Sequence, residues 1–131
     1  RETEDYLISL LRPGHIRGLT LLGGEPMEPD NQRALLPFLR RVKAECPGKD
    51  IWCWSGATYE RLHTDGDHFR CEITDELLSL LDVLVDGLFV EALKDLSLRF
   101  RGSSNQRLID LNATRRTGAL TFLPDRDRSR M

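Results

Sequence analysis

Several segments of the chain have apolar residues every three or four positions, the spacing of an amphipathic helix. The first such segment follows acidic residues and ends at Pro13-Gly14. We expect Asp30 to cap the second helix, Pro37 to kink it, and Thr74 to cap a third. The apolar stripes of the three helices are Tyr6, Leu7, Leu10 and Leu11; Leu35, Leu36, Leu39 and Val42; and Leu77, Leu78 and Leu81. Each helix therefore has one face that can pack against a core.

Short apolar runs lie between these helices and predict strands. Residues 16–22 are apolar on successive positions at their end, the pattern of a strand buried on both faces. The other predicted strands are residues 51–54, residues 83–85 and a weaker one at 107–111. Alternation of strands and helices predicts an α/β fold with a mostly parallel sheet, flanking helices and right-handed crossovers. Ligands of such sheets bind outside the carboxyl ends of the strands, so we expect function in loops 23–27, 55–58 and 86–88.

Composition narrows the class of protein only slightly. A chain of 131 residues with 40% hydrophobic content is predicted to form one domain with a real core. A net charge of -2 gives no reason to expect nucleic acid or a membrane surface as partner. No apolar run approaches the roughly 20 residues that span a bilayer, and no secretory leader opens the chain. The 3 cysteines are widely spaced, as free thiols of a reducing compartment would be. We expect a soluble, cytoplasmic protein.

The first candidate for a ligand-binding loop is Gly23-Gly24-Glu25-Pro26, directly after the first predicted strand. Two glycines let a ligand approach the backbone closely, and Pro26 stiffens the exit from the turn. Taken alone, the motif is also compatible with an ordinary strand-to-helix turn, because short motifs match often by chance. The sequence around it has to decide between the two.

Four further blocks follow this motif. They are residues 44–52, Trp54-Ser55-Gly56 with Tyr59, residues 82–90 and residues 101–106. In this order, and over residues 19 to about 111, the sequence resembles the activating enzymes of anaerobic ribonucleotide reductase, members of the radical S-adenosylmethionine (radical SAM) superfamily. The resemblance implies an incomplete radical-SAM-type partial (β/α) barrel as the core domain in residues 1–113. An arginine-rich, loosely packed C-terminal tail would then occupy residues 114–131.

The resemblance also implies cofactors and partners. An activating enzyme of this family uses S-adenosylmethionine and a [4Fe-4S] cluster to generate the glycyl radical of anaerobic ribonucleoside-triphosphate reductase, with an electron donor such as a flavodoxin-like protein. Its cluster is held by Cys-x3-Cys-x2-Cys, a spacing that this sequence lacks. We therefore expect the cluster ligands in a missing upstream segment, whose loss would leave a sheet edge exposed and the chain poorly soluble. Cys46 and Cys53 are interpreted as packing residues.

Two other functions remain open. The chain could be a catalytically inactive truncated module that binds cofactor weakly or docks the reductase without redox chemistry. It could also be a related radical enzyme that acts on a small molecule, although such an enzyme should not share residues 101–106.

The resemblance assigns the S-adenosylmethionine site residue by residue. The expected cofactor-binding residues are Gly23, Gly24, Glu25, Pro26, Ser55, Gly56, Asp86 and Asn105. The bend would bind the amino group of the cofactor, and Ser55 would donate its hydroxyl to the ribose or the carboxylate. The alternatives are a solvated turn serine for Ser55, a strand-ending Asp-Gly turn for Asp86 and a loop-organising amide for Asn105. No catalytic side chain is assigned, because the difficult chemistry belongs to the cofactors.

One other group of residues has potential metal ligands. His63, Asp65, Asp67, His68 and Cys71 lie close together in sequence. Their spacing matches no familiar zinc pattern, and Asp65-Gly66-Asp67 is typical of a loop. We interpret this segment as a solvated insertion between a short helix and the next one, and we assign no metal ligand.

Overall fold

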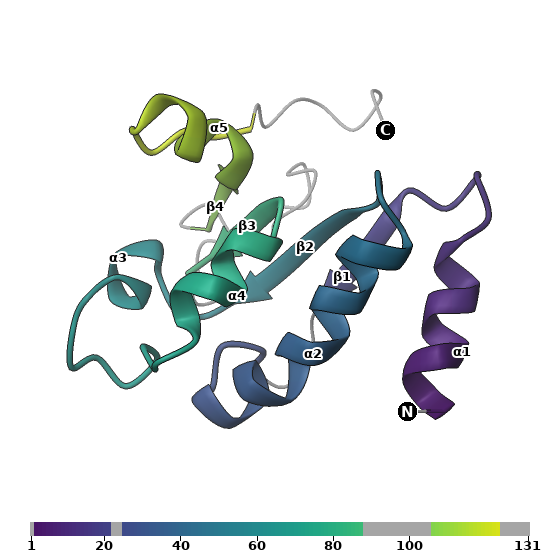
Figure 1. Ribbon diagram of the computed structural model, residues 1–131. Coiled ribbons are helices and arrows are strands. Elements are labelled where there is room, and N and C mark those ends of the chain that lie inside the picture. Colours follow the sequence, from purple (N-terminus) through teal and green to yellow (C-terminus); the bar gives the residue numbers. More distant parts are fainter. Residues whose placement is uncertain (1, 22–24, 88–105, 124–131) are drawn as a thin grey trace.

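The computed structural model describes residues 2–21, 25–87 and 106–123 (Figure 1). In chain order its elements are α1 (Glu2–Leu11), β1 (Gly18–Leu21), α2 (Pro29–Glu45), β2 (Asp50–Ser55), α3 (Tyr59–Leu62), α4 (Thr74–Leu80), β3 (Val83–Asp86), β4 (Arg107–Asp110) and α5 (Leu111–Thr117). The expected strands and the three expected amphipathic helices are confirmed in type and order. Helix α5 is an addition, because Leu111 opens a helix instead of ending a strand.

The strands form one four-stranded sheet in the order β1-β2-β3-β4. The β1–β2 and β2–β3 pairs are parallel and the β3–β4 pair is antiparallel, which confirms an α/β fold with a mostly parallel sheet and flanking helices. Because β4 runs in the opposite direction, its first residue, Arg107, lies beside Asp86, the last residue of β3. The last strand is therefore not part of the expected series of parallel crossovers.

The position of a strand in the sheet decides how deeply it is buried. All residues of β3 are buried, because β3 has a neighbour on each side and packing on both faces. Strand β1 stands at the end of the strand order, and its residue Thr20 is exposed while the other residues are half-buried. The expectation that this strand is buried on both faces is therefore wrong.

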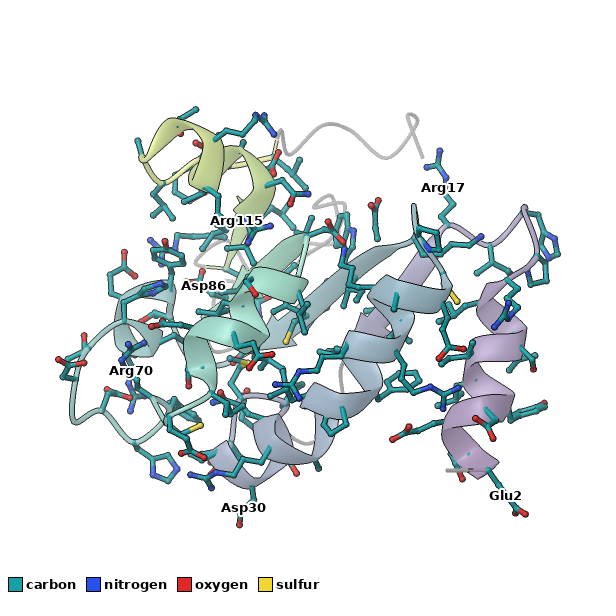
Figure 2. All side chains as sticks on the ribbon, in the orientation of Figure 1. Glu2, Arg17, Asp30, Arg70, Asp86 and Arg115 are labelled. Carbon is teal, nitrogen blue, oxygen red and sulfur yellow. The ribbon has the colours of Figure 1, made fainter. Side chains whose placement is uncertain are left out.

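Two predicted helix caps are also wrong. Helix α2 begins at Pro29, where the missing amide of proline costs nothing, so Asp30 belongs to the first turn. Its carboxylate points away from the body of the molecule (Figure 2) and pairs with Arg33 at 3.1 Å. Thr74 is the first residue of α4, and its hydroxyl donates to the side-chain oxygen of Gln32 at 2.8 Å instead of capping the helix. Pro37 lies inside α2, which continues to Glu45.

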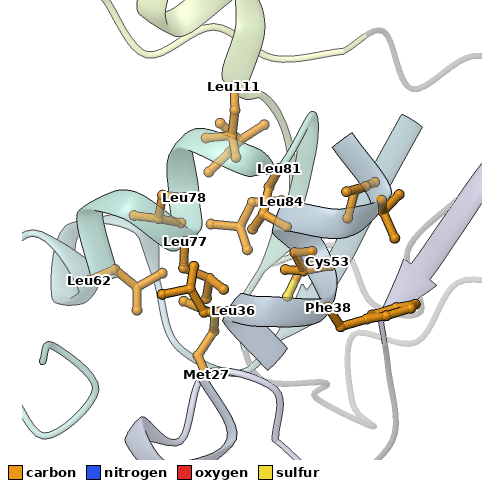
Figure 3. Packing of buried hydrophobic residues seen from close by; sticks show 14 of the residues in the cluster. Met27, Leu36, Phe38, Cys53, Leu62, Leu77, Leu78, Leu81, Leu84 and Leu111 are labelled. Atoms are coloured by element: carbon orange, nitrogen blue, oxygen red, sulfur yellow. The ribbon is translucent and has the colours of Figure 1, made fainter. Parts of the chain in front are cut away.

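The larger core cluster has residues of the sheet and of helices α1, α2 and α4. Figure 3 shows part of it, with Leu36 of α2 and Leu77 of α4 near Cys53 of the sheet. Cys46 is 4% exposed and Cys53 is fully buried in this cluster, as expected of packing residues. The opposite face of the sheet has a smaller cluster in which Trp52 and Trp54 pack partly buried against Val83, Val85 and Leu108, with Leu123 beside them. Cys53 thus faces the larger cluster, and its neighbours Trp52 and Trp54 face the opposite side of the sheet.

The C-terminal part of the described chain packs onto β4. Helix α5 ends at Gly118, whose φ of 74° is the left-handed conformation that glycine tolerates best. The chain then returns along β4, where Leu123 donates its amide hydrogen to the carbonyl of Leu108 at 2.8 Å. The predicted boundary after residue 113 falls inside α5, and residues 124–131 lie outside the described residues. The division into a core domain and a tail stays a prediction. None of the helices in the described ranges is both long and apolar enough to cross a membrane.

Candidate functional site

The side chain of Glu25 joins the loop after β1 to the carboxyl end of β2. One carboxylate oxygen accepts the hydroxyl hydrogen of Ser55 at 2.6 Å and the amide hydrogen of Met27 at 2.9 Å. The other accepts the amide hydrogen of Gly56 at 2.8 Å. Parallel strands end at the same edge of a sheet, so this contact is the convergence of loops that the topology predicts. Glu25, Ser55 and Gly56, which we selected from separate sequence blocks, therefore form one group.

The hydroxyl of Ser55 acts as both a hydrogen-bond donor and a hydrogen-bond acceptor. It donates to Glu25 and accepts the amide hydrogen of Ala57 at 2.9 Å. Ser55 is 5% exposed and Ala57 is fully buried, so the alternative of a solvated turn serine is wrong. A hydroxyl has one hydrogen to donate, and here that hydrogen goes to Glu25.

A second buried carboxylate closes the end of β3. Asp86 is fully buried, and it accepts the amide hydrogen of Tyr59, the first residue of α3, at 2.7 Å. Arg107 binds both of its oxygens, from Nε at 2.9 Å and from Nη2 at 2.5 Å. The guanidinium of Arg107 also contacts Glu60 of α3 at 2.6 Å, and this hydrogen bond is the main reason why the pKa of Glu60 is lowered. Asp86 does end its strand before a turn, but its side chain is fixed by three hydrogen bonds from Tyr59 and Arg107.

These contacts form a continuous series across the sheet. Glu25 links the bend after β1 to β2, Tyr59 links the loop after β2 to Asp86, and Arg107 links Asp86 to β4. Figure 2 shows Asp86 near the middle of the molecule, below the labelled Arg115 of α5. Next to it, Gln106 donates to the carbonyl of Gly87 at 3.0 Å. The carboxyl end of the sheet is thus braced by polar side chains from one loop to the next.

Not all predicted site residues can be placed. Gly23, Gly24 and Asn105 lie outside the described residues. Pro26 is buried and directly follows Glu25 in the sequence. Of the eight predicted cofactor-binding residues, the structure brings Glu25, Ser55 and Gly56 into direct contact, and it connects Asp86 to them through the loop that leads to α3.

Sequence reasoning missed two residues of this region, Arg107 and Gln32. Arg107 has no signal of its own, because its contact depends on the antiparallel register of β4. Gln32 is fully buried and donates to the carbonyls of Met27 and Phe69, both at 2.7 Å. Its position four residues before Leu36 on the apolar stripe of α2 is a signal that could have revealed a buried polar residue.

The cysteines of the described chain do not fit a [4Fe-4S] cluster. Cys46 and Cys53 are buried in the core on separate elements, and Cys71 lies within hydrogen-bond distance of Gln32 and Thr74. Burial, with a contribution from the charge of Glu25, raises the pKa of Cys53 to about 12, whereas an iron ligand has to be a thiolate. Within residues 2–21, 25–87 and 106–123, no group of three or more His, Cys, Asp or Glu residues could hold a metal ion.

The segment with potential zinc ligands is arranged by other contacts. His63 approaches the carbonyl of Tyr59 at 2.8 Å, and His68 pairs with Glu28 at 2.8 Å. Asp67 pairs with Arg61, whose hydrogen bond is the main cause of the lowered pKa of this carboxyl. These side chains point to separate partners and organise an exposed loop.

Comparison with known proteins agrees with the resemblance to activating enzymes of anaerobic ribonucleotide reductase that the sequence blocks indicate. The family model described as a 4Fe-4S single cluster domain matches residues 1–109. A relative from Vibrio cholerae serotype O1 is 44% identical over 108 residues, which cover 81% of this chain and 64% of the relative. One from Escherichia coli K12 is 44% identical over 79% of this chain and 63% of its own length. One from Enterobacteria phage T4 is 38% identical over 81% of this chain and 61% of its own length.

All three relatives carry the name anaerobic ribonucleoside-triphosphate reductase-activating protein. The chain spans slightly less than two thirds of the length of these relatives. No solved structure matches the chain. The chain belongs to the 4Fe-4S single cluster domain family, and the proteins to which it is homologous are activating proteins of anaerobic ribonucleoside-triphosphate reductase.

Proposed function

We propose that this chain is the S-adenosylmethionine-binding part of an activating protein for anaerobic ribonucleoside-triphosphate reductase. The observation that carries the proposal is the contact of Glu25 with Ser55 and Gly56 at the carboxyl ends of β1 and β2. Two of the sequence blocks that resemble the activating enzymes meet there, at the edge where parallel sheets bind ligands. The reductase enters the proposal as the target named for the relatives.

The acceptors around Glu25 suit the ammonium group of the cofactor's methionine end. A carboxylate has about four positions for hydrogen bonds, and three donors from the described residues occupy those of Glu25, so these residues leave one position for a ligand. We assign this position and the main-chain carbonyls of Gly23 and Gly24 to the ammonium, while Pro26 stiffens the bend. Ser55 acts through Glu25, because its only hydroxyl hydrogen is donated there.

The remaining assigned residues complete the rim of the proposed site. Gly56 presents its backbone beside Glu25, Asp86 holds the loop before α3, and Asn105 is assigned to the site by its place in the sequence block 101–106. In this proposal the four-stranded sheet is a section of a partial (β/α) barrel, and the bound sulfonium serves to form the glycyl radical of the reductase with electrons from a flavodoxin-like donor. The protein would work in the cytoplasm, where its free thiols stay reduced.

In this proposal the ligands of the [4Fe-4S] cluster lie outside the described residues. Since the described cysteines do not suit a [4Fe-4S] group, we place its ligands in a segment upstream of Arg1 and assign no redox step to residues of the described chain. The second candidate is a module that docks the reductase, or binds cofactor weakly, without redox chemistry. The buried thiol of Cys53 favours this candidate for the isolated chain.

The test is a titration of the 131-residue chain with S-adenosylmethionine, followed by the amide NMR signals of Gly56 and Met27. Glu25→Gln removes the negative charge and replaces one acceptor oxygen by an NH2 donor, which opposes either the Gly56 amide or the Ser55 and Met27 donors. It should weaken binding by about tenfold or more. Glu28→Gln is the matched control, because the carboxylate of Glu28 pairs with the exposed His68 and has no contact with Ser55 or Gly56 in the described part of the chain. Equal affinities of the two variants, or no response of the wild type, would refute cofactor binding at this bend.

Two further measurements separate the two candidates. Anaerobic reconstitution with iron and sulfide should leave the chain without a stable cluster, and bound iron in the ratio of a [4Fe-4S] group would overturn our assignment of the cysteines. The second measurement is binding to the purified reductase with and without S-adenosylmethionine. If the chain binds both the reductase and the cofactor, the result supports the activating role. If the chain binds the reductase but does not bind S-adenosylmethionine, the result supports the docking module instead.

A further inference from the structure

Arg107 stands at the junction of three segments. It contacts Asp86 at the end of β3 and Glu60 in α3, and its guanidinium lies 6.0 Å from the ring centroid of Phe122 in the returning C-terminal segment. Its own side chain is 29% exposed, whereas that of Asp86 is 1% exposed. A positive charge that is partly shielded from water is therefore placed against a carboxylate that is wholly shielded.

We propose that Arg107 is a positioning residue that holds the loop between β2 and α3, residues 56–58, in place by neutralising Asp86. This inference rests on the proposed function, in which that loop forms one wall of the S-adenosylmethionine site. Arg107 does not touch the proposed ligand position at Glu25. It acts through Asp86, which binds the amide of Tyr59, and through the short loop between Tyr59 and Gly56.

Electrostatics explains why Asp86 needs this partner. A buried carboxylate is stable as an anion only when opposite charge and hydrogen bonds replace the water that it has lost. Asp86 has three such hydrogen bonds, and two of them come from Arg107 in the bidentate geometry that only arginine supplies. Without Arg107, the Asp86 side chain would lose two of its three hydrogen bonds and rotate toward solvent, which weakens its hold on Tyr59.

The loop is held at both ends by hydrogen bonds to carboxylates, so the loss of either contact should increase the motion of the whole loop. Glu25 binds the amide of Gly56 at one end, and Asp86 binds the amide of Tyr59 at the other. Ala57, between them, is fully buried. Release of the Tyr59 end should therefore also loosen the Gly56 end, because the two residues between the two holds, Ala57 and Thr58, cannot move independently.

The experiment measures hydrogen exchange of backbone amides in the full chain without any ligand. In Arg107→Gln, we expect the Tyr59 and Gly56 amides to exchange about tenfold faster or more, the factor carried by one charge-assisted hydrogen bond. Arg107→Lys keeps the charge and loses the bidentate contact, so its Tyr59 and Gly56 amides should exchange at rates between those of the wild type and Arg107→Gln. If Arg107→Gln does not fold, the lysine variant is measured in its place. The control is Arg40→Gln, which removes a bidentate pair with Glu76 at 2.7 Å on both arms, with the arginine side chain 54% exposed.

Amides of the central strands distinguish positioning from general stability. If the amides of Cys53 and Leu84 accelerate as much as those of Tyr59 and Gly56, Arg107 is a stability residue and the inference is wrong. Unchanged exchange at Tyr59 in a folded Arg107 variant would refute it as well. Glu60→Gln removes only the exposed arm of the contact, and it should leave the exchange of Tyr59 within about threefold of the wild type.

A ligand titration then separates this inference from the proposed function. If the wild type does not bind S-adenosylmethionine, the proposed function fails, and amide exchange alone still decides whether Arg107 holds the loop. If the wild type binds, Arg107→Lys should weaken binding by at least about threefold while Arg40→Gln leaves it unchanged. A loosened loop in Arg107→Lys together with wild-type affinity would support the hold of Arg107 on the loop, and it would refute the part of the proposed function in which the loop is a wall of the site.

Discussion

Replacing Ser55 by alanine tests the central contact of the site with the smallest possible change. The substitution removes one oxygen atom and leaves the backbone of β2 untouched. Two hydrogen bonds disappear with that oxygen: the one donated to Glu25 at 2.6 Å and the one accepted from the amide of Ala57 at 2.9 Å. Both lie in a region closed to solvent, since Ser55 is 5% exposed and Ala57 is fully buried.

The magnitude follows from the two broken contacts. A hydrogen bond to a charged group contributes about 1.5–3 kcal/mol, and a buried amide without an acceptor costs about 1–3 kcal/mol. The sum overstates the loss, because Glu25 keeps the Gly56 and Met27 donors and neighbouring contacts do not add. We expect Ser55→Ala to lower the free energy of unfolding by about 2–4 kcal/mol, or the melting temperature by about 10 °C for a chain of this size.

The assay is urea-induced unfolding at neutral pH, with Ser79→Ala as the matched control. The hydroxyl of Ser79 donates to the carbonyl of Glu76 at 2.6 Å on an exposed helix surface, so its loss should change the free energy of unfolding by less than about 0.5 kcal/mol. A double-mutant cycle of Ser55→Ala with Glu25→Gln then isolates the coupling between the two side chains. If both serine variants are equally stable, the brace between β1 and β2 contributes nothing and our account of the site is wrong.

Three further substitutions or treatments test other parts of the structure. Iodoacetamide should alkylate the half-buried Cys71 well before Cys53, whose burial raises its pKa to about 12, and peptide mass spectrometry that finds the reverse order would contradict the packing of β2. Gly18→Ala places a Cβ atom 2.0 Å from the carbonyl oxygen of Asp50 and should cost about 3 kcal/mol in thermal unfolding, whereas Gly14→Ala, with no atom within 4 Å, should be nearly neutral. Burial acts to raise the pKa of Asp82, but hydrogen bonds from Asn112, Lys43 and the Ile51 amide outweigh it and leave that pKa lowered. A carboxyl with a lowered folded pKa stabilises the protein above its unfolded pKa of about 4 and loses this effect as pH falls. Asp82→Asn should therefore be less stable than the wild type at pH 7 and closest to it near pH 3, and a constant difference across this range would refute the assignment.

The sequence predicts much of the fold, because the local patterns and the topology agree. Periodicity identifies α1, α2 and α4, and apolar runs identify the four strands. The rule that ligands bind at the carboxyl ends of parallel strands then selects Glu25, Ser55 and Gly56 from loops that are far apart in sequence, and the structure brings them together. Helix caps are less predictable, since a proline at the first position of α2 starts the helix before Asp30 can cap it.

What the sequence could not predict depends on register and on partners. The antiparallel direction of β4 follows from contacts across the sheet, and it alone puts Arg107 beside Asp86. The burial pattern of β1 depends on its place at the end of the strand order. The hydroxyl of Ser55 could equally have pointed to a ligand or to Glu25, because a sequence states which groups can form hydrogen bonds and says nothing about which partner is nearest.

The use of side chains as braces has a consequence for recognition at this edge. The side chains of Glu25, Ser55 and Asp86 form most of their hydrogen bonds with groups of neighbouring loops in the described residues. A ligand at this edge would therefore bind mainly to main-chain groups. Main-chain groups cannot change rotamer, and a braced loop presents them in fixed directions, which lowers the entropy lost on binding. Substitutions in the brace should therefore lower the affinity for a ligand even where the altered side chain never touches it. The loss of affinity should increase with the loosening of the loop measured before any ligand is added.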